Sequence, residues 1–180
     1  MPTPTKEGYT FKGWAVSNTS TEYITSSTIA NITSDQVLYA IWDDGRLYLY
    51  KYGDECTSIT GGWNVGARES NGQAEKKEDH MYLYRNSSTL STNSYCGTVN
   101  NIDMSGYSKL VVHYKKTQAY SNSSFGVLFV SYGSPTGGYS SPNTNEGEYT
   151  EEFPIVSSPT TIFMHSYSDY NCIYEVYLKK

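Results

Sequence analysis

Four acidic residues lie close together in the last third of the chain: Glu146, Glu148, Glu151 and Glu152. Two carboxylates at a controlled separation can cleave a glycosidic bond, and several carboxylate oxygens together can bind a hard cation such as Ca²⁺. The four residues could instead form an acidic rim exposed to water, with neither a catalytic nor a metal-binding role. We expect the solvated rim, with Ca²⁺ binding as the second alternative and catalysis as the third.

The histidines and cysteines do not form a recognised catalytic or metal-binding motif. No Gly-x-Ser-x-Gly elbow and no Cys-x-x-Cys pair is present. A dyad of Cys172 with His165 is conceivable, but alternation favours a packed His165 and a surface position for His113. We expect no enzyme activity and no cofactor, Ca²⁺ excepted. We also expect buried free thiols, with one disulfide and a leftover thiol as the alternative, at Cys56, Cys96 and Cys172.

Aromatic side chains are the strongest functional lead, because the chain holds 19 Tyr, 3 Trp and 5 Phe. Aromatic rings can stack on sugars and anchor protein interfaces. Tyr48, Tyr50 and Tyr52 form a ladder on one face of a predicted strand, and for Tyr48 and Tyr50 we expect burial in the core. Residues on loops are better placed to meet a ligand. The predicted ligand-binding residues are therefore Trp63, Tyr132, Tyr139 and Tyr149.

Charge and hydropathy exclude two classes of partner. The net charge is −5, and the lysines and arginines are not clustered, so a nucleic-acid partner is not expected. No apolar run approaches the ~20 residues that cross a bilayer, so membrane insertion is not expected either. No signal peptide is visible at the N-terminus. We interpret the chain as either cytosolic or a piece of a longer protein.

The pattern of strands and turns predicts an all-β protein. About eight apolar or alternating runs are separated by Gly, Asn, Ser and Pro, which is typical of a β-sandwich or jelly roll. We expect the strands at 46–52 and 172–178 to pair, and Tyr174, Val176 and Leu178 to face the core. The turn cluster at 43–45 is the predicted linker between residues 1–42 and a jelly-roll β-sandwich over 46–180.

The first segment has a specific arrangement of glycines and aromatics. Pro4-Thr5, Glu7-Gly8-Tyr9, Phe11 and Gly13-Trp14 are followed by a closing Leu38-Tyr39-Ala40-x-Trp42. Over residues 4–42 this pattern resembles the Listeria–Bacteroides repeat, a small β-grasp-like module. An opening strand with an Asn-Gly-Gly turn is missing, so we interpret the repeat as truncated on its N-terminal side. The resemblance implies a secreted, surface or phage-tail context and no catalysis.

A second resemblance concerns residues 46–180. The segment Ile102-Asp103-x-Ser105-Gly106-Tyr107-x-Lys109-Leu110 and the late strand Ile173–Leu178 resemble carbohydrate-binding and galactose-binding-like jelly-roll modules. This likeness is at the level of the fold, and one fold hosts many functions.

Together these features predict a non-catalytic binding or adhesion module, located outside the cell, on its surface or on a virion. It would be the C-terminal part of a longer bacterial surface or phage tail protein and would recognise a glycan or a protein. A purely structural spacer or assembly module is the alternative, and a fragment of a polysaccharide hydrolase is the third. The oligomeric state is left open.

Overall fold

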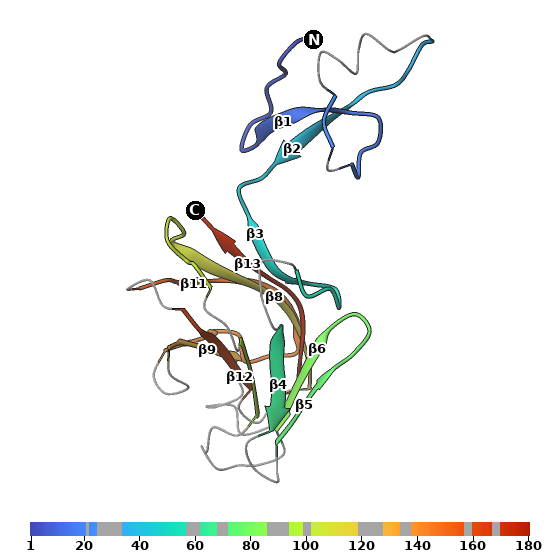
Figure 1. Cartoon of the computed structure of the whole chain (residues 1–180). Coiled ribbons are helices and arrows are strands. Elements are labelled where there is room, and N and C mark those ends of the chain that lie inside the picture. The colour runs from blue at the N-terminus through green and yellow to red at the C-terminus, as the bar shows by residue number, and fades with distance from the viewer. Residues whose placement is uncertain are drawn as a thin grey trace. The chain divides into compact units, whose positions relative to one another are not determined.

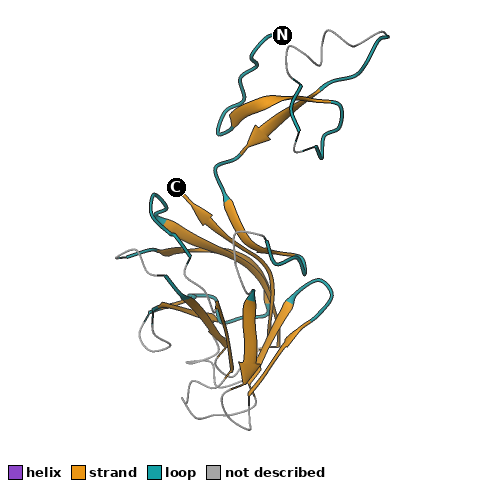
Figure 2. Ribbon diagram, viewed as in Figure 1, coloured by secondary structure: helices purple, strands orange, loops and turns teal. Residues whose placement is uncertain are grey.

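The structure is a computed structural model of the 180-residue chain, and it describes residues 1–20, 22–24, 34–56, 62–67, 72–85, 94–98, 102–118, 128–133, 138–156, 160–166 and 170–180. Every helix or strand in these ranges is a β-strand, which confirms the all-β prediction (Figure 2). The same ranges contain no helix long and apolar enough to span a bilayer. The chain divides into two compact units, Met1–Arg46 and Leu47–Lys180.

The strands follow one another along the chain with turns and loops between them (Figure 1). The first unit holds β1 (Thr10–Ala15) and β2 (Tyr39–Asp43). The second unit holds β3 (Leu47–Lys51), β4 (Trp63–Ala67), β5 (Gly72–Lys76), β6 (Met81–Arg85), β7 (Ser94–Thr98), β8 (Lys109–Gln118), β9 (Leu128–Tyr132), β10 (Tyr139–Ser140), β11 (Gly147–Pro154), β12 (Ile162–Ser166) and β13 (Tyr170–Lys179).

The first unit is an antiparallel pair of β1 and β2 with an aromatic cluster. The ring of Phe11 contacts the rings of Trp14 and Trp42 edge to face, at centroid distances of 5.7 and 5.5 Å. The indole N–H of Trp14 donates to the carbonyl of Pro2 at 2.9 Å. The aromatic residues near the N-terminus therefore hold together a unit too small for an aliphatic core.

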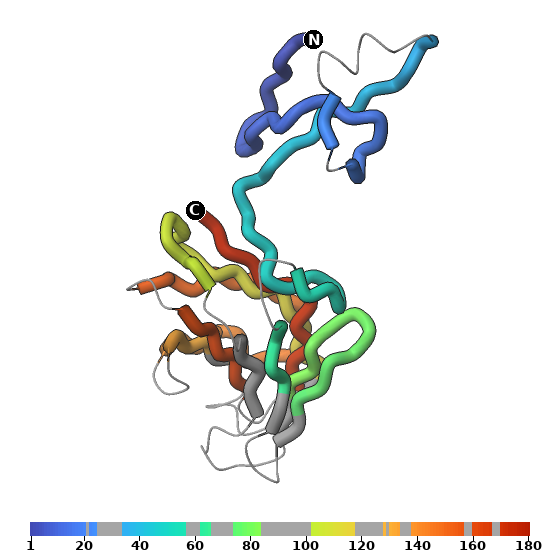
Figure 3. Tube along the Cα trace, viewed as in Figure 1, coloured from blue at the N-terminus to red at the C-terminus, as the bar shows by residue number. Residues whose placement is uncertain are grey.

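The second unit is a sandwich of two antiparallel sheets (Figures 1 and 3). One sheet has the strand order β10-β9-β12-β7-β4. The other has the order β11-β8-β13-β6-β5, and β3 also pairs with β13. Along the chain the strands pass repeatedly from one sheet to the other, as in a jelly roll. The predicted β-sandwich is confirmed.

Buried side chains from both sheets form one core. On the six-stranded sheet, β8 contributes Leu110 and Val112, and on the five-stranded sheet β9 contributes Leu128 and Val130. Burying one such aliphatic side chain stabilises the fold by roughly 1.5–3 kcal/mol. Alternation along β8 sends Leu110 and Val112 inward and leaves His113 on the other face, as the sequence predicts.

Strand β13 is the centre of the six-stranded sheet. It pairs with β8 along one edge for almost its whole length. Along the other edge it pairs first with β6, at residues 170–173, and then with β3, at residues 175–178. The expected pairing of the segments 46–52 and 172–178 is therefore confirmed.

A bulge in β13 changes the direction of one tyrosine. Ile173 pairs with Tyr114 and Glu175 pairs with His113, so Tyr174 is an extra residue without a partner on β8. Ile173 takes the core position, and Tyr174 lies on the outer face against His113. The prediction that Tyr174 faces the core is wrong, because strict alternation fails at a bulge.

A second bulge lies between β3 and β13. Tyr48 pairs with Tyr177 and Tyr50 pairs with Val176, so Leu49 is the extra residue. Both Leu49 and Tyr50 are buried. The expected burial of Tyr50 is confirmed, and the bulge allows the neighbouring Leu49 to be buried as well.

The turn that follows β3 lies against the turn between β5 and β6. Gly53 has a φ of 88°, and a Cβ atom added there would lie 1.9 Å from the backbone carbonyl oxygen of Glu78. Only glycine combines this positive φ with so close an approach of two backbones.

We therefore expect the substitution Gly53→Ala to lower the free energy of unfolding by about 2–3 kcal/mol, because it adds a backbone clash to an unfavourable φ. Urea unfolding followed by tryptophan fluorescence measures the change. The matched control is Gly106→Ala, where φ is 78° but no atom lies within 4 Å of the added Cβ. The control should lose only about 1 kcal/mol. Equal losses at both positions would contradict the close approach.

Candidate functional site

The outer face of the six-stranded sheet carries a group of aromatic side chains. On β6, Met81 and Leu83 are buried in the core and Tyr82 lies between them on the opposite face. The neighbouring strands and turns present further rings on that face. We call this group the aromatic platform, and its members are Tyr52, His80, Tyr82, His113, Tyr170 and Tyr174.

The rings of the platform form a chain that begins at β6 and the start of β13. The ring centroids of Tyr170 and Tyr82 are 6.1 Å apart, and those of Tyr82 and His80 are 6.2 Å apart. His80 in turn lies 5.6 Å from Tyr174. All three pairs are tilted or edge-to-face contacts at distances where aromatic rings attract one another.

Tyr174 is the centre of the platform. Its ring lies 5.9 Å from Tyr52 and 5.7 Å from His113, and the rings of Tyr52 and His113 are 6.4 Å apart. Burial raises the pKa of the Tyr174 hydroxyl. The bulge that turns Tyr174 outward thus completes the ring network.

Carboxylates stand beside the two histidines of the platform. Asp79 Oδ1 lies 2.6 Å from His80 Nδ1, and Glu148 Oε1 lies 2.8 Å from His113 Nε2. Glu175 Oε2 lies 3.8 Å from the other nitrogen of His113. These oxygens fix the orientation of the imidazole rings, and the exposed ones can also accept hydrogen bonds from hydroxyl groups. The platform therefore offers both stacking surfaces and polar groups.

The ring-covered face continues along β3. The rings of Tyr48 and Tyr177 are 5.1 Å apart, and the ammonium group of Lys51 lies 4.4 Å from the centroid of Tyr48. The Tyr48 side chain therefore lies on the outer face and is only half-buried. The tyrosine ladder read from the sequence is divided by the bulge: Tyr50 enters the core, and Tyr48 and Tyr52 stay on the outer face.

The expectation that Trp63 is exposed is wrong. Its side chain is only 1% exposed, and its indole N–H donates to the carbonyl of Leu49 at 3.1 Å. Its backbone N–H donates to Glu55 Oε1 at 3.0 Å. Trp63 begins β4 and its ring packs into the core, so this residue is an anchor of the sandwich.

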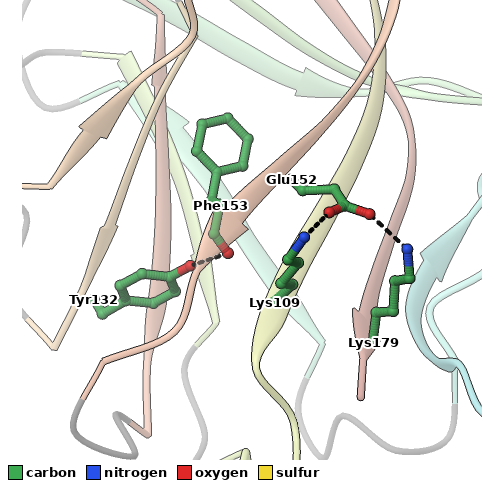
Figure 4. A network of polar contacts seen from close by, with 5 residues as sticks. All are labelled: Lys109, Tyr132, Glu152, Phe153 and Lys179. Atoms are coloured by element: carbon green, nitrogen blue, oxygen red, sulfur yellow. Dashed lines mark hydrogen bonds and ion pairs between the residues drawn. The ribbon is translucent and has the colours of Figure 1, made fainter.

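Tyr132, Tyr139 and Tyr149 are half-buried strand residues packed against the core, not exposed loop residues. The ring of Tyr132 lies 6.4 Å from that of Tyr139, and its hydroxyl donates to the carbonyl of Phe153 at 3.5 Å (Figure 4). Tyr149 lies 5.7 Å from the buried Tyr114. The expected loop exposure is corrected, and their role in ligand binding stays a prediction.

The predicted acidic cluster is divided between the two faces of β11. Glu148 and Glu152 lie on the outer face, and Glu151 lies on the inner face with Tyr149 and Phe153. Glu146 precedes the strand. Across the described residues, no three side chains of His, Cys, Asp or Glu come together in a way that could hold a metal ion. The four carboxylates therefore do not lie together in one cluster, and Ca²⁺ binding stays a prediction.

Glu151 and Glu152 differ in their structural partners. Glu151 Oε1 accepts hydrogen bonds from the hydroxyls of Ser141 and Tyr114, at 2.8 and 3.1 Å, and from the amide of Asn143. These hydrogen bonds of Glu151 connect β10 and the loop that follows it to the inner face of β8 and β11. Glu152, in contrast, joins the outer face of three neighbouring strands.

The conceivable Cys172–His165 dyad is not formed. Cys172 lies on β13 in the six-stranded sheet, and His165 lies on β12 in the five-stranded sheet, where its Nε2 is 3.4 Å from the hydroxyl of Ser131. Burial raises the pKa of the Cys172 thiol, which makes it a poor nucleophile. Cys172 is a buried free thiol, as expected, and Cys56 is a free thiol that is only half-buried, whereas the side chain of Cys96 lies outside the described part of the chain.

The strands that carry the aromatic platform were predicted from the sequence, whereas the grouping of their aromatic side chains was not. Tyr48 and Tyr50 of β3 were expected in the core, and ligand binding was assigned to other residues. The histidines His80 and His113 and the bulged Tyr174 were missed. One signal could have identified His113. Alternation places it on the outward face between Val112 and Tyr114, and β13, the strand that pairs with β8, contains several tyrosines.

One family model matches part of the first unit. The family model of the Listeria-Bacteroides repeat domain matches residues 1–41, which confirms the resemblance seen over residues 4–42. A search among curated protein sequences finds no match.

Two solved structures are similar to the chain at a low level. One is titled "BiXyn10A CBM1 APO"; it is 16% identical, covers 75% of this chain and 96% of its own, and has a TM-score of 0.48. The other is described as a carbohydrate-binding module, CBM28, specific for non-crystalline cellulose; it is 11% identical, covers 76% of this chain and 84% of its own, and has a TM-score of 0.32.

Glu152 links the outer faces of β8, β11 and β13 (Figure 4). Its carboxylate pairs with the ammonium groups of Lys109 and Lys179, the latter at 2.6 Å. The hydrogen bonds from Lys109 and Lys179 hold the pKa of Glu152 below its ordinary value. A depressed native pKa stabilises the fold above the unfolded-state pKa, and this contribution is lost as the pH falls through the native pKa.

We expect Glu152→Gln to lower the free energy of unfolding by about 0.5 kcal/mol at pH 7, since the group is partly exposed and screened. The difference from the parent should shrink as the pH falls below the unfolded-state pKa of about 4.3, and vanish once the folded carboxylate is protonated as well. Urea unfolding at several pH values measures it. Glu78→Gln, at an exposed glutamate of the same unit, is the control and should change little. A difference that is as large at pH 3 as at pH 7 would refute the ion-pair explanation.

Proposed function

We propose that residues 47–180 form a non-catalytic module that binds a neutral glycan on the aromatic platform. The observation that carries the proposal is the network of four tyrosine and two histidine rings on one outer sheet face. A flat ring can stack on the C–H face of a sugar, and a tyrosine hydroxyl can bond to a sugar hydroxyl at the same time. No other group of described residues combines these features on the outside of the sandwich.

The charges around the platform favour a neutral ligand. The three nearest acidic groups, those of Asp79, Glu148 and Glu175, all contact the platform histidines. Carboxylates accept hydrogen bonds from sugar hydroxyls but repel the carboxylates of an acidic polysaccharide. We therefore infer that uncharged polysaccharides bind and polyuronates do not.

The arrangement also favours binding over hydrolysis. Glycosidases need two carboxylates on either side of the scissile bond. Glu151 and Glu152, two of the four acids considered for hydrolysis, point to opposite faces of β11 and are occupied by hydrogen bonds or ion pairs. Glu148 and Glu175 both orient His113.

We infer an extracellular setting for the chain, at a bacterial surface or on a virion. The match of residues 1–41 to the Listeria-Bacteroides repeat supports this setting, which the resemblance implies. In such a protein the first unit would be a spacer or contact module, and the sandwich would supply recognition.

A second candidate function, assembly through the first unit, is favoured by its exposed apolar side chains. Six of the eight large hydrophobic residues that are exposed in the described part of the chain lie there: Met1, Tyr9, Val16, Tyr23, Val37 and Tyr39. Exposed apolar groups that gather on one unit are typical of contact surfaces.

Affinity electrophoresis tests the glycan proposal directly. We expect gels containing xylan, mixed-linkage β-glucan or galactomannan to retard the parent chain, and gels containing polygalacturonate not to. Tyr174→Ala should weaken the retardation about tenfold, because Tyr174 contacts three other rings of the platform.

The matched control is Tyr39→Ala, which removes an exposed tyrosine from the first unit. It should bind as the parent does. The melting temperature and the tryptophan fluorescence of each variant report on its folding. Free migration of the parent in every gel, together with a blank glycan array, would refute the proposal.

Light scattering tests assembly. If the first unit drives it, the chain should self-associate with rising concentration, and the double substitution of Val16 and Val37 by serine should abolish this. The same substitutions should leave glycan retardation unchanged. A parent chain that stays monomeric at all concentrations would exclude self-assembly through this surface.

A further inference from the structure

Tyr52 has a backbone conformation that tyrosine rarely adopts. Its φ is 44°, and it is the only non-glycine residue with a positive φ in the described ranges. In this region the Cβ atom of an L-residue lies too close to a neighbouring carbonyl oxygen. Asparagine and aspartate tolerate the conformation far better than tyrosine does.

The turn that contains Tyr52 does not require a tyrosine. Lys51 N–H donates to the carbonyl of Asp54 at 2.9 Å, and Asp54 N–H donates to the carbonyl of Lys51 at 2.9 Å. The two residues between them, Tyr52 and Gly53, both have positive φ, which is the requirement of a type I′ turn. The preferred pair in such a turn is Asn-Gly, so Tyr52 occupies the position that favours asparagine.

Burial does not account for the tyrosine either. Its side chain is 51% exposed, and among the described residues of the second unit only Val156 is a further exposed large hydrophobic residue. The buried half of the ring lies on Tyr174 and His113. A hydrophobic anchor of the fold would be enclosed far more completely, as Trp63 is.

The position of Tyr52 is nevertheless held firmly. Its backbone N–H donates to the carbonyl of Tyr174 at 2.7 Å, at the bulge of β13. The next residue, Gly53, lies against the carbonyl of Glu78. The ring is thus fixed over the centre of the platform with one face available to a ligand, which limits the entropy lost on binding.

We propose that Tyr52 contacts the ligand directly and that its unfavourable backbone is retained for this contact. The inference rests on the proposed glycan-binding function of the platform. Strained residues that persist without a structural need are characteristic of binding sites, where they pre-organise a side chain. The free half of the Tyr52 ring would stack on a sugar ring of the same uncharged polysaccharide.

The test separates stability from binding by replacing Tyr52 with residues that suit the turn. We expect Tyr52→Asn and Tyr52→Gly to melt at a temperature no lower than that of the parent, because both relieve the backbone. Both should reduce retardation in xylan, β-glucan or galactomannan gels by about tenfold, as loss of a central aromatic contact does. Tyr52→Phe keeps the ring and should be retarded within about threefold of the parent.

The outcomes distinguish this inference from the function on which it rests. Retardation of Tyr52→Asn and Tyr52→Gly equal to that of the parent would overturn the role of Tyr52 and leave the glycan proposal standing. A clear fall in the melting temperature of both variants would also overturn it, since the ring would then be a structural anchor. Free migration of the parent itself would overturn both.

Discussion

The pairing of β13 along both of its edges is the constraint on which the rest of the sandwich depends. One edge is shared between β6 and β3, and the exchange takes place at Tyr174, where the bulge inserts one extra residue. The carbonyl of Tyr174 accepts its hydrogen bond from Tyr52, the first residue after β3. One irregularity thus sets the direction of Tyr174 and the position of the turn that carries Tyr52.

The same constraint explains why the platform and the core can both be rich in tyrosine. A tyrosine that faces inward needs a partner for its hydroxyl, as Tyr114 finds in Ser141 and Glu151. An outward tyrosine needs none, because water or a ligand can serve. The sheet therefore uses a single residue type on two faces, and the bulges decide which tyrosine goes to which face.

Much of the fold was accessible from sequence because it follows from local patterns. The alternation of Leu110, Val112 and Tyr114 with His113, and of Met81 and Leu83 with Tyr82, identifies strands and their inner faces. The glycines and aromatics of residues 4–42 identify the repeat that the family model also finds. Prediction failed at Leu49 and Tyr174, where a bulge interrupts the alternation of inward and outward side chains. It also failed at Trp63, which begins a strand and enters the core.

The sequence by itself therefore determined the all-β class, the turns, the inward faces of the regular strands and the repeat, since each depends on neighbours within a few residues. Only the tertiary structure decided the site. It brought His80, His113, Tyr52 and Tyr174 together from four separate segments and separated the consecutive acids Glu151 and Glu152. Contacts between distant strands depend on register and bulges, and these are fixed by the hydrogen bonds of the whole sheet rather than by any local run of residues.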